Sequence, residues 1–341
     1  MKTMKKLKTY KTELISDYAV IGTGNIALRH INNIKKNKKN SIITVCKRSN
    51  SKFNKNLIKA SNHFTNNINM IKPKTSKSIA IISSPASYHI NDSIVMAKNG
   101  FHLLIEKPMA TDKNKTKNLI SLCKKNKLKT LIGYNLRFLD NIIRLKKIIK
   151  DKKYGKIHHA HIYVGSNYKT WRDNNYLHSV SHSKKLGGGV VNELSHEIDY
   201  MIYLFNQPDK VMAFTHKEDK NNAVEKKVIC LFEYKKLNFH ITMHLNMISD
   251  KNNRYCLIET DKFSIKLDLV KNKLLLSDNK SSIKKNKIND MNQTYIDELN
   301  HLHKCINSNK ETKCNLVNGI LTLNTILAIK KSLKNKMQVK I

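Results

Sequence analysis

The sequence predicts an α/β protein of two domains: a doubly wound parallel sheet, followed by an α+β domain with a large, mostly antiparallel sheet. Three observations support this fold class: a glycine turn directly follows the first apolar strand, strands alternate with helices in the first half, and short turns join strands in the second half. At 341 residues the chain is long enough for two cores. We place the domains at residues 1–135 and 136–341, with C-terminal helices that can pack back on the first domain.

The first element is an apolar strand at residues 18–21, followed by Gly-x-Gly-x-x-Ala and a helix. In this arrangement Gly22 permits a tight turn, and Gly24 lets the backbone approach a pyrophosphate. Asn25 and Ile26 open the helix, whose first N–H groups can bind phosphate oxygens. Strand, turn and helix together predict a dinucleotide-binding (Rossmann) domain.

The next strand, residues 41–46, is followed by Lys47 and Arg48, where the adenosine ribose is expected. An acidic residue at this position is typical of NAD binding, whereas a cation can hold the 2′-phosphate of NADP. Because the chain has only six arginines against 58 lysines, Arg48 carries more weight than Lys47. We therefore expect NADP as the cofactor, with NAD as the alternative.

A third apolar strand, residues 79–83, is of the buried parallel type and leads to Ser84, Pro85 and His89. Ligands of doubly wound sheets bind at the carboxyl ends of the strands. We assign these three residues to the cofactor site. The alternative is that Pro85 merely ends the strand and His89 merely caps the following helix.

The strand at residues 101–105 ends in Glu106-Lys107-Pro108. A lysine at the carboxyl end of such a strand, before a proline that restricts the turn, stands where ligand crevices form. This placement predicts a catalytic or substrate-orienting role for Lys107 and a place for Glu106 beside the cofactor. One more strand, residues 130–133, precedes the scarce Arg137, which we assign to substrate binding.

From residue 157 onward, short turns join the strands, a pattern typical of an antiparallel sheet with one solvated face. The expected strands are residues 159–164, 211–215, 227–232, 237–245, 255–259 and 263–269, and residues 290–335 are expected to be helical again.

Between these strands, Gly187-Gly188-Gly189 opens an expected helix that carries His196. Three consecutive glycines in a chain with only ten imply backbone close to a ligand. Asn192 and His196 share a polar stripe of this helix, and Glu193 at i,i+3 can reach the histidine. The alternative is an ordinary solvated stripe with a surface histidine.

An upstream loop contains Trp171, the single tryptophan, next to Arg172. An indole can stack on a sugar face, and a guanidinium can hold an anionic group. A tryptophan that serves only packing is the alternative.

Taken together, the glycine turn, Glu106-Lys107-Pro108, the Gly187 to Gly189 run and His196 resemble the glucose-fructose oxidoreductase / inositol dehydrogenase family (Gfo/Idh/MocA) over nearly the whole chain. The resemblance implies an NAD(P)-dependent oxidoreductase that interconverts a hydroxyl and a ketone on a sugar, sugar derivative or cyclitol, with surface-carbohydrate metabolism as one setting. It also implies a homo-dimer or homo-tetramer through the exposed sheet face. Many members have an aspartate where this chain has Asn192.

Two other functions are weighed against this one. The second hypothesis is a catalytically silent dinucleotide-binding sensor or scaffold, because Asn192 cannot take a proton. The formal charge of +39 suggests, thirdly, a basic nucleic-acid-binding protein. The lysines are spread along the whole chain and accompany many asparagines and isoleucines, which favours a coding bias toward adenine and thymine. Since base recognition favours arginine, we expect no specific nucleic-acid partner.

Composition also bears on the compartment. The longest apolar stretches, such as residues 101–105, are far too short to span a membrane, and the first sixteen residues lack the apolar region of a signal peptide. The six cysteines form no Cys-x-x-Cys pair, so we expect buried thiols and neither a disulfide framework nor a zinc site. A cytoplasmic protein without a membrane or metal partner is predicted.

The candidate site residues fall into three groups. Those expected to be catalytic are Lys107, His196 and Glu193. Those expected to bind the cofactor are Gly22, Gly24, Asn25, Ile26, Arg48, Ser84, Pro85, His89 and Glu106. Those expected to bind a small carbohydrate substrate are Arg137, Trp171, Arg172 and Asn192.

Overall fold

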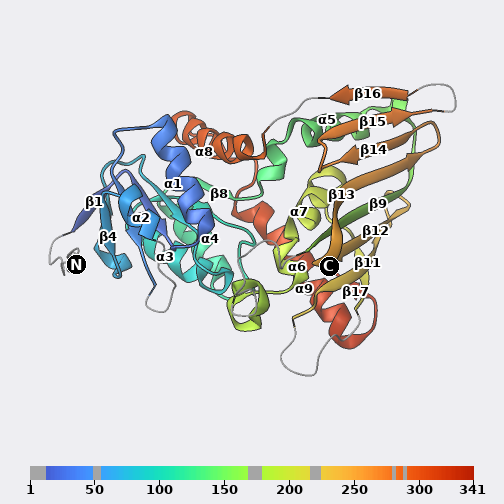
Figure 1. Cartoon of the computed structure of the whole chain (residues 1–341). Helices are drawn as coiled ribbons and strands as arrows, with labels where there is room; N and C mark the ends of the chain where they lie inside the picture. The colour runs from blue at the N-terminus through green and yellow to red at the C-terminus, as the bar shows by residue number, and fades with distance from the viewer. Residues whose placement is uncertain (1–12, 49–54, 168–178, 216–223, 279–281, 287–289) are drawn as a thin grey trace.

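The computed structural model describes residues 13–48, 55–167, 179–215, 224–278, 282–286 and 290–341. A helix-wrapped N-terminal domain stands beside a second domain built on a broad sheet (Figure 1). Trp171 and Arg172 lie outside the described residues. In the part of the chain that is described, no helix is long and apolar enough to cross a membrane.

The first domain contains a parallel sheet with the strand order β4-β3-β2-β6-β7-β8 among the described residues. Its strands are β2 (Tyr18–Ile21), β3 (Ile43–Cys46), β4 (His63–Thr65), β6 (Ile79–Ile82), β7 (His102–Ile105) and β8 (Thr130–Ile132). Helices α1 (Asn25–Asn37), α2 (Lys55–Ala60), α3 (His89–Lys98) and α4 (Thr116–Lys125) connect them. A small parallel pair, β1 (Leu14–Ser16) with β5 (Ile71–Pro73), lies at one end.

Burial explains why these segments form central strands. Every residue of β2, β3, β6 and β7 is buried, as expected for parallel strands that are covered on both faces. The chain leaves β2 for β3 on one side and returns to β6 on the other, so the strand order reverses between β2 and β6. Ligands of such sheets bind outside the carboxyl ends of the strands at this reversal.

The second domain contains a sheet whose described strands follow the order β16-β15-β14-β13-β9-β12-β11-β10-β17. Their bounds are β9 (Ile157–Asn167), β10 (Lys210–Phe214), β11 (Lys227–Tyr234), β12 (Phe239–Asn246), β13 (Ile248–Thr260), β14 (Ser264–Asp268), β15 (Lys273–Ser277), β16 (Ser282–Asn286) and β17 (Val339–Lys340). Neighbouring strands run antiparallel except β9 and β12, which pair in parallel. The predicted fold class, including a mostly antiparallel second sheet, is confirmed.

One face of this sheet is covered by helices and the other is open. Helices α5 (Asp140–Lys150), α6 (Val190–Glu193), α7 (Ser195–Phe205) and α9 (Leu316–Asn335) share a hydrophobic core with the sheet. The alternation along β11 shows the two faces, since Val228 and Cys230 are buried whereas Ile229 and Leu231 are 47% and 43% exposed. Short 3-10 turns occur at Ile68–Met70, Ala86–Tyr88, Asn135–Phe138, Lys152–Tyr154, Val180–His182 and Lys184–Leu186.

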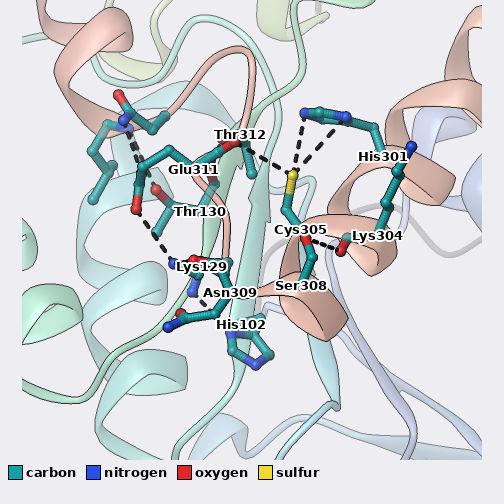
Figure 2. Close-up of polar contacts among 12 residues, drawn as sticks. His102, Lys129, Thr130, His301, Lys304, Cys305, Ser308, Asn309, Glu311 and Thr312 are labelled. Carbon is teal, nitrogen blue, oxygen red and sulfur yellow. Dashed lines mark hydrogen bonds and ion pairs between the residues drawn. The ribbon is translucent and has the colours of Figure 1, made fainter.

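The expected C-terminal helical region consists of two helices, α8 (Met291–Ser308) and α9. Figure 2 shows the connection between them beside β8 of the first domain. Thr312 Oγ1 donates to the Thr130 carbonyl at 2.5 Å, and Ile132 N donates to the Cys314 carbonyl at 2.8 Å. Lys129 Nζ donates to the Asn309 carbonyl at 3.1 Å. The connection therefore covers the edge of the parallel sheet, which would otherwise expose unpaired backbone groups.

Helix α8 belongs to the first domain by packing, although it follows the second domain in the chain. It lies beside α1 (Figure 1), and its Leu299 and Leu302 are part of the first hydrophobic core. The chain therefore passes between the two domains three times: before α5, between β16 and α8, and between α8 and α9.

Candidate active site

The turn after β2 contains two glycines, and their surroundings differ. Gly22 has φ of +124°, and a Cβ there would lie 2.5 Å from the Ser83 carbonyl oxygen, so the fold itself requires glycine. A Cβ on Gly24 would meet no atom of the protein within 4 Å. The space beside Gly24 is therefore open to a ligand.

The start of α1 is suited to an anion. Gly24 is the N-cap residue, and no side chain caps the helix there. Asn25 and Ile26 form its first turn, where backbone N–H groups lack intrahelical acceptors and the helix dipole favours negative charge. The geometry fits the pyrophosphate of a dinucleotide, which would be held by these backbone groups.

The substitution Gly24→Thr should weaken cofactor binding without disturbing the fold. Threonine and glycine are about equally good N-cap residues, so the melting temperature should hardly change. The added side chain would occupy the space of the pyrophosphate, and we expect the Kd for NADPH and NADH to rise about tenfold or more, which corresponds to about 1.4 kcal/mol. Fluorescence titration and calorimetry measure the two effects. An unchanged Kd would place the dinucleotide elsewhere.

At the end of β3, Arg48 is anchored by a neighbouring helix. Its guanidinium pairs with Asp92 of α3 and lies over the Tyr88 ring, 3.9 Å from the centroid. Ser84 Oγ donates to the same Asp92 carboxylate at 2.7 Å. The side chain of Arg48 keeps 36% of its surface exposed while that of Asp92 is buried. The Asp92 carboxylate thereby connects two predicted cofactor residues, Arg48 and Ser84. Asp92 was not singled out from the sequence.

His89 is buried between the ends of β6 and β7. Its Nε2 lies 2.7 Å from the Ser84 carbonyl oxygen and its Nδ1 lies 2.9 Å from the Pro108 carbonyl oxygen. Burial lowers the pKa of the imidazole. Both ring nitrogens contact backbone, so in this structure His89 holds two strand ends together and presents neither nitrogen to a ligand. Pro85 precedes the short turn that leads to His89.

Glu106 faces helix α1. Its Oε1 lies 2.7 Å from His30 Nε2, and both side chains are buried. Burial alone would raise the pKa of Glu106, but the hydrogen bond and charge of His30, followed by the charge of Lys107, bring it below its ordinary value. The ring of His30 also packs edge-on against Tyr295 of α8, at 5.9 Å between centroids. Sequence reasoning missed His30, which lies 76 residues from its partner.

Lys107 crosses from the first domain to the second. Its Nζ donates to the Glu193 carbonyl at 2.9 Å and lies 3.7 Å from Glu193 Oε2. The side chains of both residues remain partly exposed, at 20% and 16%. The strand end that bears the predicted catalytic lysine thus meets the helical segment that bears the predicted catalytic histidine.

That helical segment is interrupted, contrary to the prediction of one helix. Helix α6 ends at Glu193 and α7 begins at Ser195, with Leu194 between them at φ −98° and ψ 27°. The interruption changes the expected i,i+3 relation between Glu193 and His196. The carboxylate of Glu193 faces Lys107 instead of the imidazole, and the expected Glu193–His196 hydrogen bond is absent from the described structure.

His196 lies in the first turn of α7, and its ring packs edge-on against Tyr134, at 5.8 Å between centroids. Its Nδ1 is buried and has no hydrogen-bond partner among the described residues. Burial, then the charges of Lys107 and Arg254, hold the pKa of His196 well below its ordinary value. The imidazole is therefore neutral at neutral pH and able to accept a proton.

The glycine run before α6 packs against protein rather than against open space. A Cβ on Gly187 would lie 2.7 Å from Thr111 Cγ2, and one on Gly188 would lie 2.4 Å from the Ser181 carbonyl oxygen. Asn192 Nδ2 donates to the Gly187 carbonyl at 2.9 Å, and its Oδ1 accepts from Lys330 Nζ at 2.9 Å. These close protein contacts explain the glycines, and their expected approach to a ligand stays a prediction. Asn192, which is 1% exposed, links this turn to α9.

Arg137 is buried between the helices instead of lying open to a substrate. Its Nε and Nη2 donate to the two oxygens of Asp199, each at 2.8 Å, and its Nη1 donates to the Lys313 carbonyl at 2.9 Å. The side chain is 4% exposed. With these donors engaged, Arg137 joins the start of α5 to α7 and to the connection before α9, and its assigned substrate contact is not part of this geometry.

No group of three or more histidine, cysteine or acidic side chains within the described residues could hold a metal ion.

Comparison with known proteins adds to this geometry. A family model described as an oxidoreductase family with an NAD-binding Rossmann fold matches residues 16–134, and the model of its C-terminal alpha/beta domain matches residues 146–341. Among curated proteins, glucose-6-phosphate 3-dehydrogenase of Bacillus subtilis is 27% identical over 131 residues, which is 37% of this chain and 36% of that protein. An uncharacterized oxidoreductase of Streptococcus pneumoniae is 20% identical over 194 residues, 55% of this chain and 52% of that protein. The matched region spans about half of the length of these curated relatives, or less.

Solved structures match along nearly their whole length. Levoglucosan dehydrogenase, in complex with NADH and levoglucosan, has a TM-score of 0.80 at 16% identity and covers 96% of this chain and 100% of its own. The WlbA dehydrogenase of Bordetella pertussis, in complex with NADH and UDP-GlcNAcA, has a TM-score of 0.76 at 16% identity, with coverage of 96% and 98%. These likenesses concern the fold.

The two family models together take in both sheets, the glycine turn, Lys107 and His196. The nicotinamide-dinucleotide fold predicted from the glycine turn is thereby confirmed, and the chain belongs to the Gfo/Idh/MocA family of oxidoreductases.

Proposed function

We propose that this protein is an NAD(P)-dependent dehydrogenase that interconverts a hydroxyl and a ketone on a sugar, a sugar derivative or a cyclitol. One observation carries the proposal: Lys107, at the carboxyl end of β7, reaches the α6–α7 segment that presents the neutral His196. The cation and the base come from different domains, and Lys107 contacts Glu193, three residues before His196 in the chain.

Each residue has a role that follows from its chemistry. A bound nicotinamide would accept or supply the hydride. His196 takes the hydroxyl proton during oxidation and returns it during reduction, because its low pKa keeps the imidazole neutral. Lys107 donates a hydrogen bond to the reacting oxygen and stabilises its developing negative charge. The Glu193 carboxylate beside Lys107 orients the ammonium group.

The known proteins that resemble this chain support the sugar class. The proteins of similar sequence or fold include a glucose-6-phosphate 3-dehydrogenase, a levoglucosan dehydrogenase and a dehydrogenase bound to UDP-GlcNAcA. On this basis we extend the proposal to a role in carbohydrate metabolism, with surface carbohydrates as one setting. Asn192 gives little support to the silent-sensor alternative, because its amide is used by the glycine turn and Lys330.

The function is tested with the purified protein in two steps at moderate salt. Nicotinamide fluorescence is first titrated with NADPH and NADH, and sugars and cyclitols are then screened for cofactor reduction and for the reverse reaction. Micromolar binding and turnover of at least one sugar are expected. Tight binding without turnover across a broad panel would favour the silent sensor, and no binding of either cofactor would end the proposal.

For the cofactor, we infer a preference for NADP over NAD. Arg48 is held beside the end of β3 by Asp92, with an exposed part that can meet a 2′-phosphate. Arg48→Ala should raise the Kd for NADPH about 10- to 100-fold, as expected for a lost charged hydrogen bond, and leave the Kd for NADH nearly unchanged. Lys47→Ala is the matched control. Equal losses for the two cofactors would contradict the phosphate contact.

We further infer that the protein is a homo-dimer or homo-tetramer. The open face of the second sheet exposes Phe214, Ile229 and Leu231 at 56%, 47% and 43%, and the first two are paired across β10 and β11. An apolar patch of this kind marks an interaction site. Light scattering should give a multiple of the chain's mass, and Leu231→Lys should lower it. A monomer at all concentrations would refute the inference.

A cytoplasmic location is also inferred. All six cysteines lie buried as free thiols, the state expected in a reducing compartment. Quantifying free thiols in protein purified without reductant tests this, since recovered disulfides would speak for an oxidising compartment.

A further inference from the structure

Arg254 lies on β13, next to the helix that carries His196. Its Nε donates to Glu197 Oε1 at 2.6 Å, and Glu197 follows His196 directly at the start of α7. The Glu197 side chain is completely buried, whereas the Arg254 side chain is 22% exposed. The ion pair therefore anchors one side of the guanidinium and leaves another side accessible.

The terminal nitrogens of Arg254 are the unusual feature. A guanidinium carries five N–H donors in a rigid fork, and within the described residues only the Nε donor of Arg254 has an acceptor. Arg137 offers a comparison, because all three of its nitrogens have acceptors. Nε and Nη2 donate to the two oxygens of one carboxylate, and Nη1 donates to a backbone carbonyl. Arg254 has a buried carboxylate as the acceptor for Nε, whereas its terminal nitrogens have no acceptor among the described residues.

The location of Arg254 points to the reacting centre. Its charge is one of the causes that lower the pKa of His196, together with that of Lys107. Arg254 also interacts electrostatically with Tyr295 of α8, a helix packed on the first domain. The guanidinium is held by Glu197, the residue that follows the proposed base in the chain.

We propose that the terminal nitrogens of Arg254 bind an oxyanion of the substrate, a carboxylate or a phosphate, so that the natural substrate is an acidic sugar derivative. This inference rests on the proposed dehydrogenase function. A planar fork that is fixed by a buried carboxylate can bind a second oxyanion through two parallel hydrogen bonds. The fork would hold this anion beside the helix that carries His196, and Lys107 would remain available to the reacting oxygen.

The test compares matched sugars that differ only in charge. Glucose, galactose and mannose are each assayed beside their uronate and their 6-phosphate, with the preferred cofactor. We expect kcat/KM for at least one acidic member to exceed that of its neutral parent about 10- to 100-fold, the effect of a hydrogen bond to a charged group. The uronate and phosphate arms identify which oxyanion is bound.

Arg254→Lys keeps a cation beside Glu197 but removes the fork, and it should reduce the preference for the acidic sugar about tenfold or more. Arg144→Lys, on α5, is the matched control and should leave the preference unchanged. Melting curves check that both variants fold. An equal preference in Arg254→Lys and in the wild type would overturn the proposal, as would equal kcat/KM for neutral and acidic sugars.

Binding separates this proposal from the proposed function. The protein saturated with reduced cofactor is titrated calorimetrically with the same uronates and 6-phosphates. Binding of an acidic sugar that Arg254→Lys weakens, without turnover of any sugar, would uphold the oxyanion contact and reject the dehydrogenase. Turnover of neutral sugars with no acidic preference in binding or rate would do the reverse. Absence of both binding and turnover would reject both.

Discussion

Lys107→Met should lower kcat about 10²- to 10³-fold, the usual cost of removing one donor to a developing oxyanion. Methionine has a similar shape but cannot donate a hydrogen bond or carry charge, so the transition state loses its partner. The dinucleotide should bind nearly as before, because the glycine turn is untouched. Steady-state kinetics with the sugar found in the screen, beside a cofactor titration, measures both quantities.

A second lysine provides the comparison that a chain with 58 lysines requires. Lys117 is exposed on α4, and Lys117→Met should leave kcat and Kd unchanged. Urea unfolding of both variants checks whether the lost contact between Lys107 and the Glu193 carbonyl loosens the domains. Wild-type kcat in Lys107→Met would remove the lysine from the catalytic machinery.

Arg137→Leu should destabilise the fold by about 3–5 kcal/mol at neutral pH, the range seen when one partner of a buried ion pair is removed. The substitution leaves the Asp199 carboxylate buried, and Thr322 Oγ1 is its remaining donor. Burial already raises the pKa of Asp199 in the intact protein, against the effect of Arg137. Urea denaturation of the variant and the wild type gives the difference in unfolding free energy.

The loss should shrink as the pH falls. Without Arg137 the folded-state pKa of Asp199 rises further above its unfolded value, so the folded state takes up a proton that the unfolded state does not hold. Protonation removes the buried charge, and the destabilisation is therefore greater at neutral than at acidic pH. Arg144→Leu on α5 is the control and should stay within about 0.5 kcal/mol of the wild type. A similarly small effect for Arg137→Leu would contradict the anchoring role.

Most of the first domain could be predicted because its signals are local. An apolar run, a glycine turn and a helix follow one another at residues 18–37, and each strand end is marked by a turn residue. The short strands β1, β4 and β5 and the later strands β15 to β17 were missed. Their length of two to five residues is too short for a clear alternation pattern.

The candidate site was predicted unevenly. Lys107 and His196 were singled out from the sequence, and the structure brings Lys107 to Glu193, three residues before His196; the catalytic roles of both stay predictions. The partner of His196 was wrong, because the helix breaks at Leu194 and turns Glu193 toward Lys107. Arg254 could have been noticed as a scarce arginine, but its position beside α7 depends on a strand that pairs with β9, more than eighty residues earlier in the chain.

What the sequence by itself determined is the type and order of the elements, the dinucleotide fold, and which residues stand at the strand ends and at the glycine turn. These depend on neighbours in the chain, whose spacing shows periodicity and turn chemistry directly. What only the tertiary structure decided is the partner of each polar side chain: Glu106 with His30, Asn192 with Lys330, Lys107 with Glu193. These partners are 76 to 138 residues apart. The packing of whole elements brings them together, and burial then makes each contact necessary, because a buried polar group without a partner is costly.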